Sequence, residues 1–549
     1  MKRTLLLPVF AIACAGTLIA QAQPSTITGR LLGSDGKPMP KAHVHLLLPQ
    51  QRQPFAAAEV NPDGTFQIQT DRTGMITLQF TGAYHQSHQI PLLIEIPRRI
   101  ALDVTLGPRA IITSFDDVKI IGDFNDFDFQ TPKSLTKGKN GVSTATFKTD
   151  AAAFTYQILV GSDPRSTFSM NGTQSEDYIY DGGGDYRSLV TPKKGKVTIT
   201  FDPAKMPRTA AEASVMYHDS ATARLAAIVD EMERQQRTFM MAWSAHAQSG
   251  NADSAFNYDW SKEMAAILER SRAESDPLVR NALLLQYTAL TLNGRNADPE
   301  VARRVLREIP PTSQLWALDP KLMDDAIAGT DTPEKFESYR WEAIEKHPDS
   351  NVRMTILANT IANAYYGKEP EKLRRYYDYM VAHFPDHQET RYVKAQYGPD
   401  RNVMAGKSVP PFTLASLDNA SETLSSEQMK GKYYMIDFWA TWCGPCVAEM
   451  ASLHRAYERF HGRNFEIISL SFDGRPDAVR KFRDAKWKMP WRHGFVEGNF
   501  DSKLAEQFEV VGIPKPILVD GNGMIVAVGE ELRGKDLERT LERVLGVAN

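Results

Sequence analysis

The residues that most constrain the fold are 433–450, where an apolar run ends in two closely spaced cysteines. The run Tyr433–Trp439 has the length of a buried strand, and the residues after Cys446 continue at helical spacing. Cys443 is therefore expected at the start of a helix, where partial positive charge and unpaired N–H groups favour a thiolate over a thiol. Two cysteines separated by two residues also close reversibly on each other. The stretch predicts a strand, a redox-active Cys443–Cys446 disulfide and a helix.

The N-terminal residues predict export. A basic start, an apolar run over residues 5–20 and the small-x-small pattern Ala20-Gln21-Ala22 are typical of a cleaved signal peptide. We therefore expect a signal at 1–22 and a mature chain in the periplasm or the cell envelope. Two alternatives are open. An uncleaved anchor is disfavoured because the run is short and contains Pro8, and lipid attachment at Cys14 is disfavoured because the usual leucine three residues before it is missing.

The cysteine count favours redox chemistry over a structural role. The chain has three cysteines, and Cys14 leaves with the predicted signal, so that Cys443 and Cys446 are the mature pair. A protein held together by disulfides shows more cysteines at wider spacing, and the loop between these two is too short to constrain the unfolded chain much. A zinc site needs two more thiols or imidazoles at suitable spacing. We expect no metal and no cofactor.

Length and charge limit the organisation and the partners of the chain. A chain of 549 residues is too long for one hydrophobic core, so we expect several domains. The formal net charge is −3 and no block of basic residues occurs, which gives a nucleic-acid partner no electrostatic support.

Residues 23–107 predict a small β-domain. Strand patterns such as TITGRLL and AHVHLLL alternate with glycine-containing turns. The stretch TGRLLGSDGKPMPKAHVHL resembles the transthyretin-like, regulatory-type modules of exported bacterial proteins, and this resemblance implies a β-sandwich. His43 and His45 lie two positions apart on one face of a strand, as two metal ligands would, but no third ligand is visible nearby, and an ordinary half-buried face is favoured.

Residues 108–205 predict a second β-domain with immunoglobulin-like strands and a glycine turn at 181–184. The segments VKIIGDFNDFD and FTYQILVG resemble early-set domains of the glycogen-binding type. Candidates to stack on a sugar are Phe127, Phe129 and Tyr178, although the same rings serve equally well in a sandwich core or rim. The acidic cluster at 123–128 lacks the spacing of a calcium loop, and a turn is favoured there.

Residues 209–398 predict helices. Apolar residues recur there with a period near 3.6, and the pattern Pro-Glu-Lys…Tyr…Pro-Asp at 333–349 returns at 370–386, an offset of 37 residues (370 − 333). Repeats of this length resemble stacked helical hairpins of the tetratricopeptide kind, which offer a surface to a protein partner. A helical spacer that buries its own apolar faces is the favoured alternative.

Residues 404–549 predict an α/β domain. We expect strands at 433–439, 465–472, 517–520 and 524–528, with helices at 443–460, 476–486, 502–508 and 535–545. A β-α-β unit followed by β-β-α is the thioredoxin order. The segments MIDFWATWCGPCVAEM and VVGIPKPILVDGNG resemble the TlpA-like branch of exported thiol–disulfide oxidoreductases.

This resemblance implies roles for individual residues. Cys443, beside Trp442 at the helix tip, would be the exposed nucleophile that forms the mixed disulfide, and Cys446 would attack it and release the reduced client. Asp437, in an apolar strand, would have a raised pKa and take the proton from Cys446. Pro514 matches the cis-proline that faces the dithiol.

Other positions leave alternatives or depart from the family pattern. Glu449 occupies the position of an acid that tunes the cysteine pair, with a solvated helix position as the alternative. Gly444-Pro445 resembles the reducing members of the superfamily. Lys515-Pro516 and Ala451 depart from the usual residues, which bears on client preference more than on the chemistry.

The leading hypothesis is an exported thiol–disulfide oxidoreductase that reduces a disulfide-containing client protein and is recharged by a membrane thiol-reductant donor. The rival is an envelope binding or scaffold protein, with a glycan or protein ligand on residues 108–398 and a subordinate redox domain. A thiol peroxidase is disfavoured because the Pro-x-x-x-Thr-x-x-Cys pattern is missing.

Overall fold

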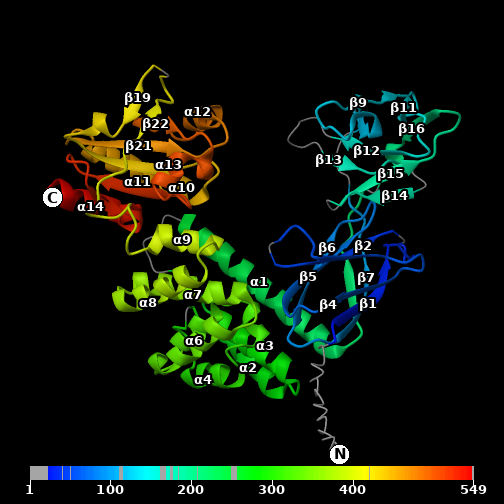
Figure 1. The fold of residues 1–549 in the computed structure, drawn as a ribbon, viewed down its shortest axis with the longest axis horizontal. Helices are drawn as coiled ribbons and strands as arrows, with labels where there is room; N and C mark the ends of the chain where they lie inside the picture. Colours follow the sequence, from blue (N-terminus) through cyan, green and yellow to red (C-terminus); the bar gives the residue numbers. More distant parts are fainter. Residues whose placement is uncertain are drawn as a thin grey trace, which may run out of the picture. The chain divides into compact units, whose positions relative to one another are not determined.

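The computed structural model describes residues 23–546 except 40, 50, 111–114, 116, 161–167, 174–176, 183–184, 207, 249–255, 257, 293 and 420. The predicted signal at 1–22 with Cys14 and part of the predicted glycine turn at 181–184 lie outside the described residues. The chain divides into two compact units, residues 1–353 and 354–549 (Figure 1). No helix among the residues that the structure describes combines the length and apolar composition needed to cross a membrane.

The first β-domain consists of two four-stranded sheets, with strand orders β17-β7-β1-β4 and β3-β2-β5-β6. Alternate side chains of both sheets are buried in one apolar core, as for Ile27 and Leu102 on one sheet and Val44 and Leu78 on the other. The strands are β1 (Ser25–Leu32), β2 (His43–Leu47), β3 (Ala56–Glu59), β4 (Thr65–Thr70), β5 (Gly74–Thr81), β6 (His88–Ile94), β7 (Arg99–Thr105) and β17 (Ser214–Tyr217).

Strand β17 comes from beyond the second β-domain and pairs antiparallel with β7. Its residue Val215 lies opposite Val104, so the segment completes the edge of the first sheet. The helical region predicted from 209 therefore begins at Ser220, because residues 214–217 are a strand.

The second β-domain has its own core between a three-stranded sheet, β10-β11-β16, and a larger sheet in the order β14-β15-β12-β8-β9, with β13 beside β12. Large apolar side chains such as Tyr156, Ile199 and Phe201 fill this core. The strands are β8 (Lys119–Gly122), β9 (Lys133–Ser134), β10 (Thr136–Lys137), β11 (Ser143–Lys148), β12 (Phe154–Val160), β13 (Phe168–Met170), β14 (Asp177–Tyr180), β15 (Tyr186–Val190) and β16 (Lys196–Phe201).

The three aromatic candidates for sugar stacking lie in different surroundings. Phe129 is 51% exposed. The guanidinium of Arg187 covers the ring of Phe127 at 3.9 Å from its centroid. Tyr178 packs edge-on against Tyr84 of the first β-domain, at 5.6 Å between centroids. Among these three rings, Phe129 is therefore the one left open for a ligand.

The other two candidate sites in the β-domains have structural partners. In the acidic cluster, Asp123 accepts hydrogen bonds from Thr155, and Asp128 accepts from the backbone of Gln130, as the predicted turn requires. His43 and His45 stack at 5.9 Å between ring centroids on β2. Within the described residues, no group of three or more His, Cys, Asp or Glu side chains is arranged to hold a metal ion.

The middle of the chain is helical. Its helices begin where the sequence supplies caps: Asp276 and Asp298 each accept a backbone N–H two residues on, with proline at the first helical position. The helices are α1 (Ser220–Gln248), α2 (Ser261–Ala273), α3 (Pro277–Ala289), α4 (Pro299–Glu308), α5 (Leu322–Ala328), α6 (Glu337–Lys346), α7 (Ser350–Tyr366), α8 (Pro370–His383) and α9 (Gln388–Tyr397). The two copies of the sequence repeat, 333–349 and 370–386, contain α6 and α8, and each is followed by a further helix, α7 and α9. A tetratricopeptide-like array stays a prediction.

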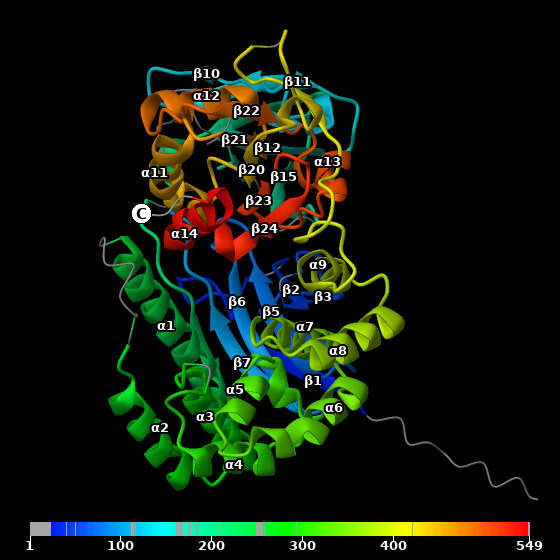
Figure 2. The same ribbon diagram turned by 90° about the vertical axis from the view of Figure 1, so that its left-hand side faces the viewer.

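The C-terminal domain is built on a five-stranded sheet in the order β22-β21-β20-β23-β24, with β20 in the middle. Helices α11 and α14 pack beside each other on one face, and α13 lies on the other, where its neighbour Phe508 contacts Phe438 (Figure 2). The elements are β18 (Thr413–Ala415), β19 (Thr423–Ser425), β20 (Tyr433–Trp439), α10 (Gly444–Ala448), α11 (Met450–Phe460), β21 (Phe465–Ser471), α12 (Pro476–Ala485), β22 (Arg492–Phe495), α13 (Lys503–Gln507), β23 (Lys515–Val519), β24 (Ile525–Val528) and α14 (Gly534–Leu545).

The prediction for this domain differs from the structure in two ways. Strands β18, β19 and β22, each three or four residues long, were not predicted. The helix predicted at 443–460 is broken at Glu449 into α10 and α11. The hydroxyl of Ser452 donates to the Glu449 carbonyl at 2.9 Å at this break, which forms with alanine rather than proline at 451.

Candidate functional site

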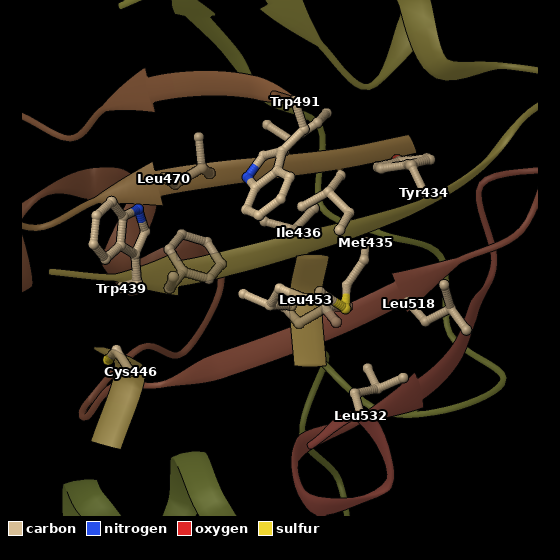
Figure 3. Packing of buried hydrophobic residues seen from close by; sticks show 14 of the residues in the cluster. Tyr434, Met435, Ile436, Trp439, Cys446, Leu453, Leu470, Trp491, Leu518 and Leu532 are labelled. Carbon is tan, nitrogen blue, oxygen red and sulfur yellow. The ribbon is translucent and has the colours of Figure 1, made fainter. Parts of the chain in front are cut away.

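The dithiol lies where the central strand ends. Strand β20 is buried from Tyr434 to Trp439, and Figure 3 shows Trp439 and Cys446 at one end of the packed core. Cys443 is the N-cap of α10 and is joined to Cys446 by a disulfide. The backbone N–H of Cys446 donates to the Cys443 sulfur at 3.2 Å. The cysteines therefore occupy the helix start that the sequence predicts.

The two cysteines differ little in exposure when joined. Cys443 is 5% exposed and Cys446 is 2% exposed, while the neighbouring Trp442 is 60% exposed. Cys443 is thus more enclosed in the disulfide than the exposed nucleophile expected from the sequence. Part of this enclosure comes from the loop before β23, whose Ile513 carbonyl oxygen lies 3.7 Å from the Cys443 sulfur.

That loop contains Pro514. The Ile513–Pro514 peptide bond is cis, and it joins the loop to β23 beside the central strand. The Ile513 carbonyl is therefore a backbone hydrogen-bond acceptor next to the dithiol.

Asp437 is a buried carboxyl group on β20. It is 5% exposed, and the hydroxyl of Ser469 on the neighbouring strand donates to it at 3.0 Å. The indole of Trp491 donates in turn to the Ser469 oxygen at 2.9 Å. Burial raises the pKa of Asp437 to about 7, and the charge of Glu449 adds to this effect while the Ser469 hydrogen bond opposes it. A carboxyl with this pKa can give or take a proton near neutral pH.

Glu449 is anchored, which excludes the solvated alternative. Its side chain accepts hydrogen bonds from Arg533 at 3.1 Å and from the backbone of Gly534, the first residue of α14, at 2.8 Å. The Ser452 hydroxyl, which donates to the Glu449 carbonyl, also lies 3.2 Å from the carboxylate. The carboxylate therefore ties the break between α10 and α11 to the start of the C-terminal helix.

We expect Glu449→Gln to lower the pKa of Asp437 towards its ordinary value, because the variant removes the negative charge that opposes ionisation of Asp437. The pH at which disulfide turnover changes should therefore move to lower values. A pH profile of turnover measures this shift, and Glu458→Gln on α11 is a control at a position on the same helix. An unmoved profile would contradict the coupling between Glu449 and Asp437.

Asp473 was missed by the reasoning from sequence. It follows β21 and is 2% exposed, and its carboxylate accepts from both the backbone N–H and the hydroxyl of Thr441, in the segment just before Cys443. The Ser471 hydroxyl donates to the same group at 2.8 Å. Because β20 and β21 are parallel, the residues after them meet at one edge of the sheet, and this rule was the available signal.

Lys515 is also buried, at 9% exposure, although it directly follows Pro514. Its ammonium donates to the backbone carbonyl of Glu509. Burial lowers the pKa of Lys515 to about 8, while Glu509 opposes this shift and Arg401 adds to it. Lys515 therefore places a cation at the base of the proline loop.

A dithiol that closes at the end of a central strand, with a cis-proline loop against it and a buried ionisable carboxyl on the same strand, belongs to one class of protein. The C-terminal domain is a thioredoxin-like thiol–disulfide oxidoreductase domain. Residues 405–528 match the AhpC/TSA family, which has this fold.

Known proteins with similar sequences agree with this class. "Thiol-disulfide oxidoreductase ResA" of Bacillus cereus is 26% identical over 150 residues, which are 27% of this chain and 81% of the relative. "Thiol:disulfide interchange protein DsbE" of Escherichia coli is 29% identical over 126 residues, or 23% of this chain and 64% of the relative. Among solved structures, the thioredoxin domain of a thiol-disulfide oxidoreductase from Bacteroides vulgatus is 33% identical, with a TM-score of 0.24, and covers 26% of this chain and 97% of that one.

Proposed function

We propose that this protein is an exported reductant of protein disulfides and that Cys443 and Cys446 carry the electrons. The observation that carries the proposal is the Cys443–Cys446 disulfide at the start of α10, with the Ile513 carbonyl 3.7 Å from the Cys443 sulfur. A disulfide at this place is the oxidised product of one turnover, and the carbonyl lies where a client backbone would pair.

In the proposed reaction, the Cys443 thiolate attacks a client disulfide, forms a mixed disulfide and releases one client sulfur as a thiolate. Cys446 then attacks Cys443, so that the Cys443–Cys446 bond forms and the second client thiol leaves. Two electrons pass to the client, and Asp437 takes the proton of Cys446 before its attack. The geometry supports this assignment through the burial of Asp437, which holds its pKa near 7.

The remaining residues would position the reactants. Trp442 is exposed beside Cys443 and would contact the client, and Pro514 would present the Ile513 carbonyl to it. Glu449 would act on the chemistry of the cysteine pair through its negative charge, which raises the pKa of Asp437. The Gly444-Pro445 pair favours the reducing direction by resemblance. A membrane thiol donor outside the cytoplasm would regenerate the dithiol, since an oxidising compartment does not.

The test is reduction of insulin by residues 23–549, with the dithiol held reduced by a chemical thiol. We expect turnover above that of the chemical thiol alone, and its loss in Cys443→Ser, because serine cannot form the mixed disulfide. Full activity of Cys443→Ser would refute the mechanism. The control is Glu458→Gln, an exposed position on the adjoining helix α11, which keeps both sulfurs.

A second candidate function, ligand binding by residues 108–398 in the envelope, is supported by the exposed ring of Phe129. A glycan pull-down that persists in Cys443→Ser and is lost in Phe129→Ala would favour this function over client reduction.

A further inference from the structure

Two ends of the loop that carries Pro514 are joined by one side chain. The loop follows α13, which ends at Gln507, and enters β23 at Lys515; the Lys515 ammonium donates across it to the Glu509 carbonyl. Between them, Val510 is buried and its N–H donates to the Ala505 carbonyl at 2.8 Å. We call this hydrogen bond between Lys515 and Glu509 the loop-base contact.

The loop begins with a left-handed residue that closes the end of α13. Glu509 has φ = 52°, and the hydrogen bond from the Val510 N–H to the Ala505 carbonyl caps the helix around it. The loop then places the Ile513 carbonyl 3.7 Å from the Cys443 sulfur. The loop-base contact thus joins the two ends of the backbone segment that carries this acceptor.

Glu509 has a second set of partners in the linker that precedes the domain. Its two carboxylate oxygens accept from the backbone N–H groups of Asn402 at 2.9 Å and Val403 at 3.2 Å. Val403 is buried in the core of the C-terminal domain. The carboxylate therefore holds the linker in the way that an N-cap holds a helix start, with both oxygens used.

The same linker is joined to helix α7. The Arg401 side chain donates to the Tyr365 hydroxyl at 2.9 Å, and its guanidinium lies 5.3 Å from the centre of that ring. Arg401 and Glu509 are also the two charged groups that act on the Lys515 ammonium. Contacts thus run without a gap from Tyr365 on α7 through the linker to the base of the proline loop.

We propose that Lys515 and Glu509 are positioning residues that fix the cis-proline loop for protein clients. The linker at 401–403 extends this set of contacts to helix α7. The proposal rests on the proposed function, because it concerns how a client disulfide is presented to Cys443. It assigns to Lys515 an effect on client binding and none on the cysteine chemistry. The KM for a small disulfide, which does not reach along the loop, should not depend on Lys515.

The test compares KM for insulin with KM for cystine in the full chain from residue 23, with the Cys443/Cys446 reduction potential measured in parallel. Lys515→Met removes the donor while keeping an unbranched side chain of similar length. We expect its KM for insulin to rise about tenfold, as for loss of one charge-assisted hydrogen bond, with the cystine KM and the potential unchanged. Lys503→Met on α13 removes an exposed lysine and is the matched control.

A pH readout separates positioning from a general loss of packing. In the wild type, Lys515 loses its charge as the pH rises through about 8, so the ratio of insulin KM to cystine KM should rise there. The ratio should be independent of pH in Lys515→Met. In Glu509→Gln the rise should begin at lower pH, because the charge that supports the ammonium is gone; Glu506→Gln on α13 is its control.

Three outcomes would overturn the proposal: an unchanged KM ratio in folded Lys515→Met, an equal change for insulin and cystine, or a shifted reduction potential that accounts for the loss. If Lys515→Met loses its far-ultraviolet dichroism and thus fails to fold, the pH profile of Glu509→Gln decides. A wild-type chain that does not reduce insulin contradicts the proposed function itself. If the wild type is active and the ratio of insulin KM to cystine KM is unchanged in Lys515→Met, only the role proposed for the loop-base contact is contradicted.

Discussion

Cys446→Ser is expected to stop turnover and to leave client proteins covalently attached to Cys443. The first attack needs only Cys443, so the mixed disulfide still forms, but the serine hydroxyl cannot displace the client. Insulin reduction should fall by about a thousandfold or more, close to the loss on removing Cys443, because residues that act as a unit are not additive. Non-reducing electrophoresis of the variant measures the adduct, which a reducing agent should release.

The order of the two sulfurs is tested by the same experiment. Cys443→Ser should form no adduct, since Cys446 is 2% exposed and lies within the helix. If Cys443→Ser trapped clients and Cys446→Ser did not, the assignment of nucleophile and resolving cysteine would be reversed. Adducts trapped in an extract and identified by mass would name the clients.

Asp437→Asn is expected to slow turnover about a hundredfold, within the range for loss of a general base. In the wild type, turnover should rise as the pH passes about 7, because Asp437 must be ionised to take the proton of Cys446. The asparagine variant cannot take a proton and should lose this rise. A pH profile of single-turnover insulin reduction, started with reduced protein, measures it.

The same substitution should stabilise the domain. The pKa of Asp437 is raised from 3.8 to about 7 by burial, so the folded state holds a proton that the unfolded state releases in this window. Stability from this group is complete below about pH 4 and is lost as the pH rises to 7, and the loss amounts to about 4 kcal/mol at most.

An asparagine at 437 does not lose stability as the pH rises, because it resembles the protonated acid in shape and charge and does not ionise. At pH 8 the variant should therefore be more stable than the wild type, while at pH 4 the two should be nearly equal. Hydrogen exchange of the β20 amides reports the free energy of opening at each pH. Equal stability at pH 8 would contradict a buried, ionisable Asp437, and Asp484→Asn on α12 is the control.

The parts of the site that the sequence predicts are those encoded within one short segment. Strand β20, the cysteines at the helix start and the carboxyl at 437 all follow from the local pattern of 433–450. The Pro514 position followed from resemblance of a second short segment. In each case, residues near one another in the chain carry the whole signal.

What the sequence does not reveal depends on residues far apart in the chain. Glu449 and Gly534 are 85 positions apart, and Glu509 meets Asn402 across 107 positions. No periodicity links such pairs, because each is created when separate elements pack. Asp473 is the exception, since the parallel pairing of β20 and β21 brings it to Thr441 by a general rule of sheets.

Strand β17 has a consequence for how the chain is connected. Because it returns to pair with β7, the second β-domain is an insertion within the first, and both of its ends leave from neighbouring strands. The backbones at Gly107 and Ala211 lie so close that a methyl group on Gly107 would be 1.7 Å from the Ala211 carbonyl oxygen. A short connection between these two backbones would remove the inserted module, and with it the ring of Tyr178 that packs against Tyr84 of the first β-domain.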